Sequence, residues 1–104
     1  MSSFPQITNE QLQLSDLPDA SASWTEIGEF ALSYNGFKAQ GSFEACAKIA
    51  NEERQDTLSD LRTCLFFEQR RWQHYGDEPD DEAMAYIRSL VEQIRAILVA
   101  GLRD

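Results

Sequence analysis

The sequence predicts an all-α fold: a small four-helix bundle-like domain with a long C-terminal helix and an irregular N-terminal tail. Apolar residues recur at helical spacing in four segments, which are bounded by capping residues and glycines. No segment shows the alternation of a strand between hairpin signals. The 104 residues, 42% of them apolar, are enough for one domain with its own core.

Residues 1–22 are expected to form a tail that packs on a single helical domain, residues 23–104. The tail has two of the three prolines and no sustained hydrophobic period, and Pro18 would end any helical turn before it. An alternative is that this segment docks into a partner. Its apolar side chains are Phe4, Ile7, Leu12, Leu14 and Leu17.

The first two helices are predicted from the capping residues and glycines at their ends. Ser23 should begin the first, because Glu26 three residues later completes a capping box, and Asn35-Gly36 should close it. Gly41-Ser42 should begin a second helix that lapses near Asn51. The expected buried stripes are Ile27, Phe30, Ala31 and Tyr34 in the first helix, and Phe43, Cys46, Ile49 and Ala50 in the second.

The third and fourth helices should form a long antiparallel hairpin. The third is expected over about residues 57–75, begun by Asp56 or Thr57 and stopped by Gly76. Asp77 or Asp80 should cap the fourth, which runs to about residue 102. The expected stripes are Leu58, Leu61, Cys64, Leu65, Trp72 and Tyr75, then Ala83, Ile87, Leu90, Val91, Ile94, Ile97 and Leu98.

The net negative charge of the chain limits the classes of partner that it can bind. The chain has 18 acidic and 9 basic residues, a net charge of −9, and residues 1–37 contain acids but no Lys or Arg. Such a surface repels phosphate backbones, so direct binding of nucleic acid is not expected. No apolar run approaches the roughly 20 residues of a membrane span, and no secretory leader is evident, so we expect a cytoplasmic protein.

Few residues are suited to catalysis or to binding a metal. His74 with Asp77 and Glu78 is a weak set of metal ligands, and the acidic run fails the EF-hand pattern. Cys46 and Cys64 lie in apolar patterns and are expected to be buried thiols, with a structural disulfide as the alternative. We therefore predict no enzyme activity, no cofactor and no metal, although the metal question at His74 stays open.

The segment EQRRWQHY, residues 68–75, is the strongest candidate for an interaction site, because Arg, Trp and Tyr are enriched at binding hot spots. The alternative is that its aromatic residues are core. On the helical wheel Phe66 projects away from the core stripe, so we expect a homodimer contact there. The predicted contact residues are Arg62, Phe66, Gln69, Arg70, Gln73 and His74. The function favoured is a protein-interaction or regulatory module; the alternative is an acidic inhibitor or immunity-type protein that neutralises a basic partner.

Overall fold

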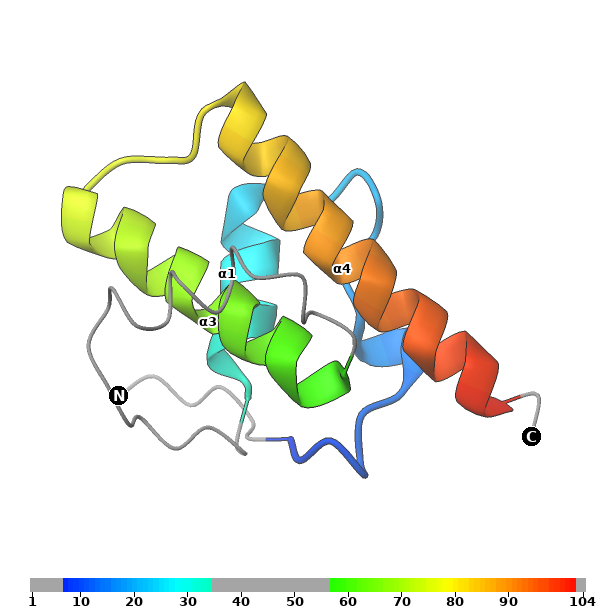
Figure 1. The fold of residues 1–104 in the computed structure, drawn as a ribbon. Coiled ribbons are helices and arrows are strands. Elements are labelled where there is room, and N and C mark those ends of the chain that lie inside the picture. Colours follow the sequence, from blue (N-terminus) through cyan, green and yellow to red (C-terminus); the bar gives the residue numbers. More distant parts are fainter. Residues whose placement is uncertain (1–6, 35–56, 103–104) are drawn as a thin grey trace.

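The computed structural model describes residues 7–34 and 57–102, in which the chain forms three α-helices and one short 3-10 helix (Figure 1). The helices are α1 (Trp24–Leu32), α3 (Leu58–Tyr75) and α4 (Asp81–Leu102), with the 3-10 helix η1 at Leu14–Asp16. The all-α class is confirmed. The helix expected after Gly41-Ser42 lies outside the described residues, so the number of four helices stays a prediction.

Each helix begins at a capping residue that the sequence indicates. The Ser23 Oγ accepts the amide hydrogen of Glu26 at 3.3 Å, and the Glu26 carboxylate accepts the Ser23 amide hydrogen at 3.5 Å, which completes the capping box. Side-chain oxygens of Thr57 and Asp80 accept the amide hydrogens three residues later, at 3.1 and 2.8 Å. Side chains thus satisfy amides that have no partner inside the helix.

Gly76 ends α3 as predicted, because its φ of 73° is the left-handed conformation that glycine adopts without strain. The first helix, in contrast, ends earlier than predicted. It stops at Leu32, and Asn35-Gly36 lie outside the described residues. Ser33 forms its C-cap, and Tyr34 pairs with Ile7 in a single parallel bridge. After α1 the chain therefore pairs with the N-terminal segment at Tyr34 and does not continue as a helix.

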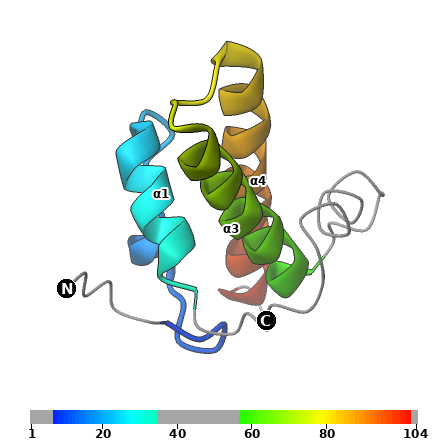
Figure 2. The same cartoon turned by 90° about the vertical axis from the view of Figure 1, so that its left-hand side faces the viewer.

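The central element is α3, which packs against both α1 and α4. The chain runs along α1, returns along α3 and reverses again along α4, so each neighbouring pair is antiparallel (Figures 1 and 2). With 22 residues, α4 is about 33 Å long at 1.5 Å per residue. The predicted hairpin of two long helices is therefore present.

The core lies where the three helices meet. The middle of the stripe predicted on α4 is buried, with 0% exposed surface for Ile87, Leu90 and Ile94, whereas Ala83, Ile97 and Leu98 towards its ends are half-buried. Cys64 is also buried, as expected, whereas Cys46 lies outside the described residues. The buried cluster is Leu12, Ala22, Ile27, Phe30, Ala31, Leu61, Cys64, Leu65, Ile87, Leu90, Val91 and Ile94.

The N-terminal segment, residues 7–22, lies against the helices. Its Leu12 belongs to the core, with 6% of its surface exposed. Two arginines of α4 hold its backbone: Arg88 donates to the carbonyls of Ala20 and Ala22, and Arg95 donates to the carbonyl of Pro18 at 2.8 Å. Long side chains from α4 thus satisfy carbonyl groups of a segment that has little regular structure of its own.

Candidate interaction surface

The end of the α3–α4 hairpin contains no fully buried residue. The last buried residue of α3 is Glu68 and the first of α4 is Ile87, and no residue between them is buried. We call residues 69–86 the hairpin tip, which stands at the upper end of the two helices in Figure 2. The prediction that Tyr75 belongs to the core is wrong, since it is 61% exposed, and Trp72 is half-buried. The helical period of apolar residues predicts which face of a helix is buried. It does not predict how far along the helix a neighbouring element covers that face.

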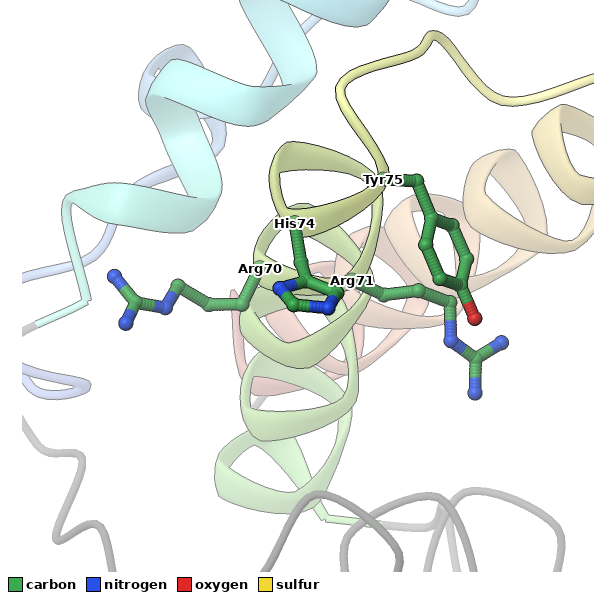
Figure 3. Close-up of a pocket in the computed structure, with 4 residues that line it drawn as sticks. All are labelled: Arg70, Arg71, His74 and Tyr75. Carbon is green, nitrogen blue, oxygen red and sulfur yellow. The ribbon is translucent and has the colours of Figure 1, made fainter.

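Four side chains on the last two turns of α3 line a pocket of about 430 Å³ (Figure 3). Arg70 and His74 are four residues apart, and so are Arg71 and Tyr75, so each pair lies along one strip of the helix. Figure 3 shows Arg70 extending to one side, Arg71 and Tyr75 to the other, and His74 between them. We call these four residues the basic-aromatic patch.

Glu68, which is 8% exposed, holds the aromatic side of this patch in place. Its carboxylate accepts a hydrogen bond from the Trp72 indole at 3.2 Å and forms an ion pair with Arg71 at 3.3 Å. The Trp72 and Tyr75 rings meet edge to face, with centroids 5.5 Å apart. A partner would therefore meet Tyr75 on a support that is already ordered, which lowers the entropy cost of binding.

The patch adjoins an acidic surface on the same tip. After Gly76 the chain turns through the exposed Asp77 and Glu78, which line a separate hollow with Trp72. Arg70 and His74 are exposed, and neither makes an ion pair within the described part of the chain. The tip thus carries basic side chains on α3 and acidic ones in the loop, with Tyr75 and Gly76 between them in sequence.

The six predicted contact residues do not form one surface. Arg70, Gln73 and His74 are exposed on the tip. Phe66 is half-buried, and its ring meets that of Phe67 edge to face at 5.8 Å. The other two, Gln69 and Arg62, turn towards α1 and the N-terminal segment.

Gln69 lies at the contact between α1 and α3. A Cβ placed on Gly28 of α1 would stand 3.6 Å from the Gln69 Cγ, so the glycine marks a close approach of the two helices that still leaves room for a methyl group. The side-chain oxygen of Gln69 is buried and accepts no hydrogen bond within the described residues. Gln69 is thus more a packing residue than a contact for a partner.

Arg62 was expected on the outer face of α3, and that expectation is wrong, because only 2% of its surface is exposed. Its guanidinium donates to the Asn9 side chain at 2.8 Å and to the Ile7 carbonyl at 3.3 Å, and it lies 4.2 Å from the centroid of the Tyr34 ring. Burial lowers the pKa of Arg62, while Tyr34 and Asp16 act in the opposite direction. The helical wheel considered one buried face, whereas α3 packs against α4 on one side and against α1 on another.

Two members of the patch, Arg71 and Tyr75, were absent from the predicted contact set. A sequence signal for them exists: both lie in the last turns before Gly76, and the following residues 77–82 contain no large apolar side chain that could cover them. At a helix end that is followed by a polar loop, the apolar stripe of the helix often has no neighbouring apolar residue to cover it.

Within residues 7–34 and 57–102, no three or more His, Cys, Asp or Glu side chains are placed to hold a metal ion, so His74, Asp77 and Glu78 do not form such a group there. Over the same ranges no helix combines the length and the apolar character that crossing a bilayer requires. No family model, curated protein or solved structure matches the chain. The functional argument therefore starts from the surface just described.

Proposed function

We propose that this protein is a non-enzymatic protein-interaction module that forms a homodimer, and that the hairpin tip is its contact surface. The observation that carries the proposal is the exposure of Tyr75, which is 61% exposed and lies in a stretch, residues 69–86, that contains no fully buried residue. Tyr75 is the one large hydrophobic residue that is exposed among the described residues. Scattered apolar residues are normal on a surface, but this one stands beside two arginines and a tryptophan.

The composition of the tip favours a protein partner. Arg, Trp and Tyr are the residue types that contribute most binding energy at protein interfaces, and here they adjoin one another. Met84 and Tyr86 on the first turns of α4 are half-buried and pack against the core, which anchors the tip. A second copy of the chain is the partner proposed, because symmetric homodimers are the commonest soluble assemblies and need one self-complementary patch.

Light scattering across a concentration series tests this proposal. The wild-type protein should have a mass of about 24 kDa, twice the 11.9 kDa of one chain. Tyr75→Ala removes a ring that is mostly in water, so it should leave folding intact and weaken the dimer about 30-fold, which corresponds to a hot spot of about 2 kcal/mol. Thr25→Ala, an exposed change on α1, is the matched control.

Two results would contradict the proposal in different ways. A wild-type mass of 11.9 kDa at the highest attainable concentration would exclude the homodimer. A Tyr75→Ala protein that dimerises as tightly as the wild type would place the contact away from the tip.

A second candidate function, an acidic inhibitor that neutralises a basic partner, is favoured by a separate groove between the N-terminal segment and α1. Its apolar lining includes Leu17 and Phe30, and acidic residues surround it. The acidic side chains are Asp16, Glu26 and Glu29. If the groove binds a basic partner, titration with an amphipathic lysine-rich peptide should show binding that weakens steeply with salt, and Glu29→Lys should reduce it. Binding that is indifferent to salt would reject this candidate.

A further inference from the structure

The hairpin tip separates its charges into two halves. Arg70 and His74 occupy one strip on the last turns of α3, and Asp77 and Glu78 follow in the loop after Gly76. The basic half of one copy would repel the basic half of a second copy and attract its acidic half. A two-fold rotation about an axis between the halves places the basic half of one copy on the acidic half of the other.

We propose that two copies of this chain pair through their tips about such an axis, located near Tyr75. In the pair, Arg70 and His74 of each copy face Asp77 and Glu78 of the partner subunit. This inference rests on the proposed homodimer and specifies its orientation. The two Tyr75 rings lie near the axis, where burial of exposed apolar surface stabilises the contact.

Three of the charged side chains assigned to these contacts have no structural task within the described residues. Arg70, Asp77 and Glu78 are exposed, and their side chains form no hydrogen bond or ion pair there. The other acids of the tip differ: Asp80 caps α4, and its first turn contains Asp81 and Glu82, where the helix dipole favours negative charge. A pairing surface built from side chains without another role costs the monomer little stability.

The net charge of the chain makes this orientation the favourable one. Two molecules of charge −9 repel each other at a distance, so a homodimer needs local attraction where the surfaces meet. Arg62, Arg88 and Arg95 are engaged with the N-terminal segment, so the other two arginines within residues 7–34 and 57–102 both lie on the tip. Any arrangement that put the acidic loops opposite each other would add repulsion at contact distance.

A charge-swap experiment tests this pairing. One variant, Arg70→Glu with His74→Glu, makes the basic half acidic; the other, Asp77→Lys with Glu78→Lys, makes the acidic half basic. Each variant alone places like charges where position 70 of one copy meets positions 77 and 78 of the other, and it should be monomeric, at 11.9 kDa. Mixed in equal amounts, they should form a heterodimer of about 24 kDa, because a two-fold pair then has opposite charges at both sets of contacts.

The matched control is Glu10→Lys with Asp19→Lys, which changes the net charge as much as the lysine variant does but at exposed acids outside the tip and outside the acidic groove. It should remain dimeric. Circular dichroism checks the folding of every variant. The wild-type protein supplies a measurement that needs no variant: raising the salt concentration from about 0.05 to 1 M, where the screening length falls to about 3 Å, should weaken the dimer at least tenfold.

Three results would overturn the inference. Wild-type dimers whose charge-swap variants also dimerise would reject this orientation while leaving the proposed homodimer in place. Variants that are monomeric alone but do not associate when mixed would show that the charges are not exchanged between copies. A salt-independent dimer would show that charge does not hold it together. A monomeric wild type is a different outcome, since it removes the proposed homodimer itself.

Discussion

Replacing Arg62 with alanine should destabilise the fold and release the N-terminal segment. The guanidinium is buried, with 2% of the residue exposed, and it joins three parts of the molecule. From α3 it reaches Asn9 and the Ile7 carbonyl in the N-terminal segment, and the ring of Tyr34 just after α1. Within the described residues it forms no ion pair, so its direct partners are neutral groups, and the charge of Asp16 adds stabilisation from a greater distance.

The magnitude follows from the contacts that are lost. Two hydrogen bonds from a charged donor contribute about 1.5–3 kcal/mol each, and a buried cation over an aromatic ring contributes about 2 kcal/mol. Against this stands the several kcal/mol that it costs to remove a charge from water. We expect Arg62→Ala to lower the free energy of unfolding by about 2–4 kcal/mol, because it also leaves a cavity and the Ile7 carbonyl without its donor.

Urea denaturation followed by circular dichroism measures the change in unfolding free energy. Hydrogen exchange gives a local measurement, because the Ile7 amide donates to the Ser33 carbonyl at 2.8 Å and should lose its protection in the variant. Thr25→Ala, an exposed change outside the proposed dimer contact, is the control and should change stability by less than about 0.5 kcal/mol. A similarly small effect of Arg62→Ala would refute the reasoning.

Three further substitutions test the core, a helix end and the N-terminal segment. Ile94→Ala deletes a side chain with 0% exposure and should cost about 2–5 kcal/mol by urea denaturation; a cost below about 0.5 kcal/mol would contradict its place in the core. Gly76→Ala meets no atom within 4 Å but forces alanine to a φ of 73°, so thermal denaturation should report a loss of about 1–2 kcal/mol, and an unchanged melting temperature would argue against the left-handed cap. Arg95→Ala removes the hydrogen bond to the Pro18 carbonyl, and proteases should then cut within residues 7–22 faster than in the wild type; equal cutting rates would show that this bond does not hold the segment.

Side chains of α3 and α4 hold the N-terminal segment in place through contacts between residues that are distant in sequence. Arg88 and Arg95 of α4 and Arg62 of α3 bind different parts of residues 7–22, while Leu12 from that segment enters the core. Because the segment has few backbone hydrogen bonds of its own, its position depends on these contacts. Stability of the N-terminal segment and of the helical core should therefore be coupled.

The sequence by itself determined the three described α-helices and most of their ends. Ser23, Thr57 and Gly76 act where their chemistry predicts, because capping depends on residues within one turn of each other. The long apolar stripe of α4 also predicted its buried face, since a helix of 22 residues repeats its period many times.

Only the tertiary structure decided which polar and aromatic side chains are covered. Arg62 is buried and Tyr75 is exposed, the reverse of what the helical wheel of α3 predicts. Both outcomes depend on how far α1, α4 and the N-terminal segment extend along α3, which is set by contacts between residues distant in sequence. The hydrophobic period gives the direction in which a side chain points from its helix axis. Whether that side chain is buried depends on which other element lies in that direction. The exposed hairpin tip therefore could not be predicted from the sequence alone.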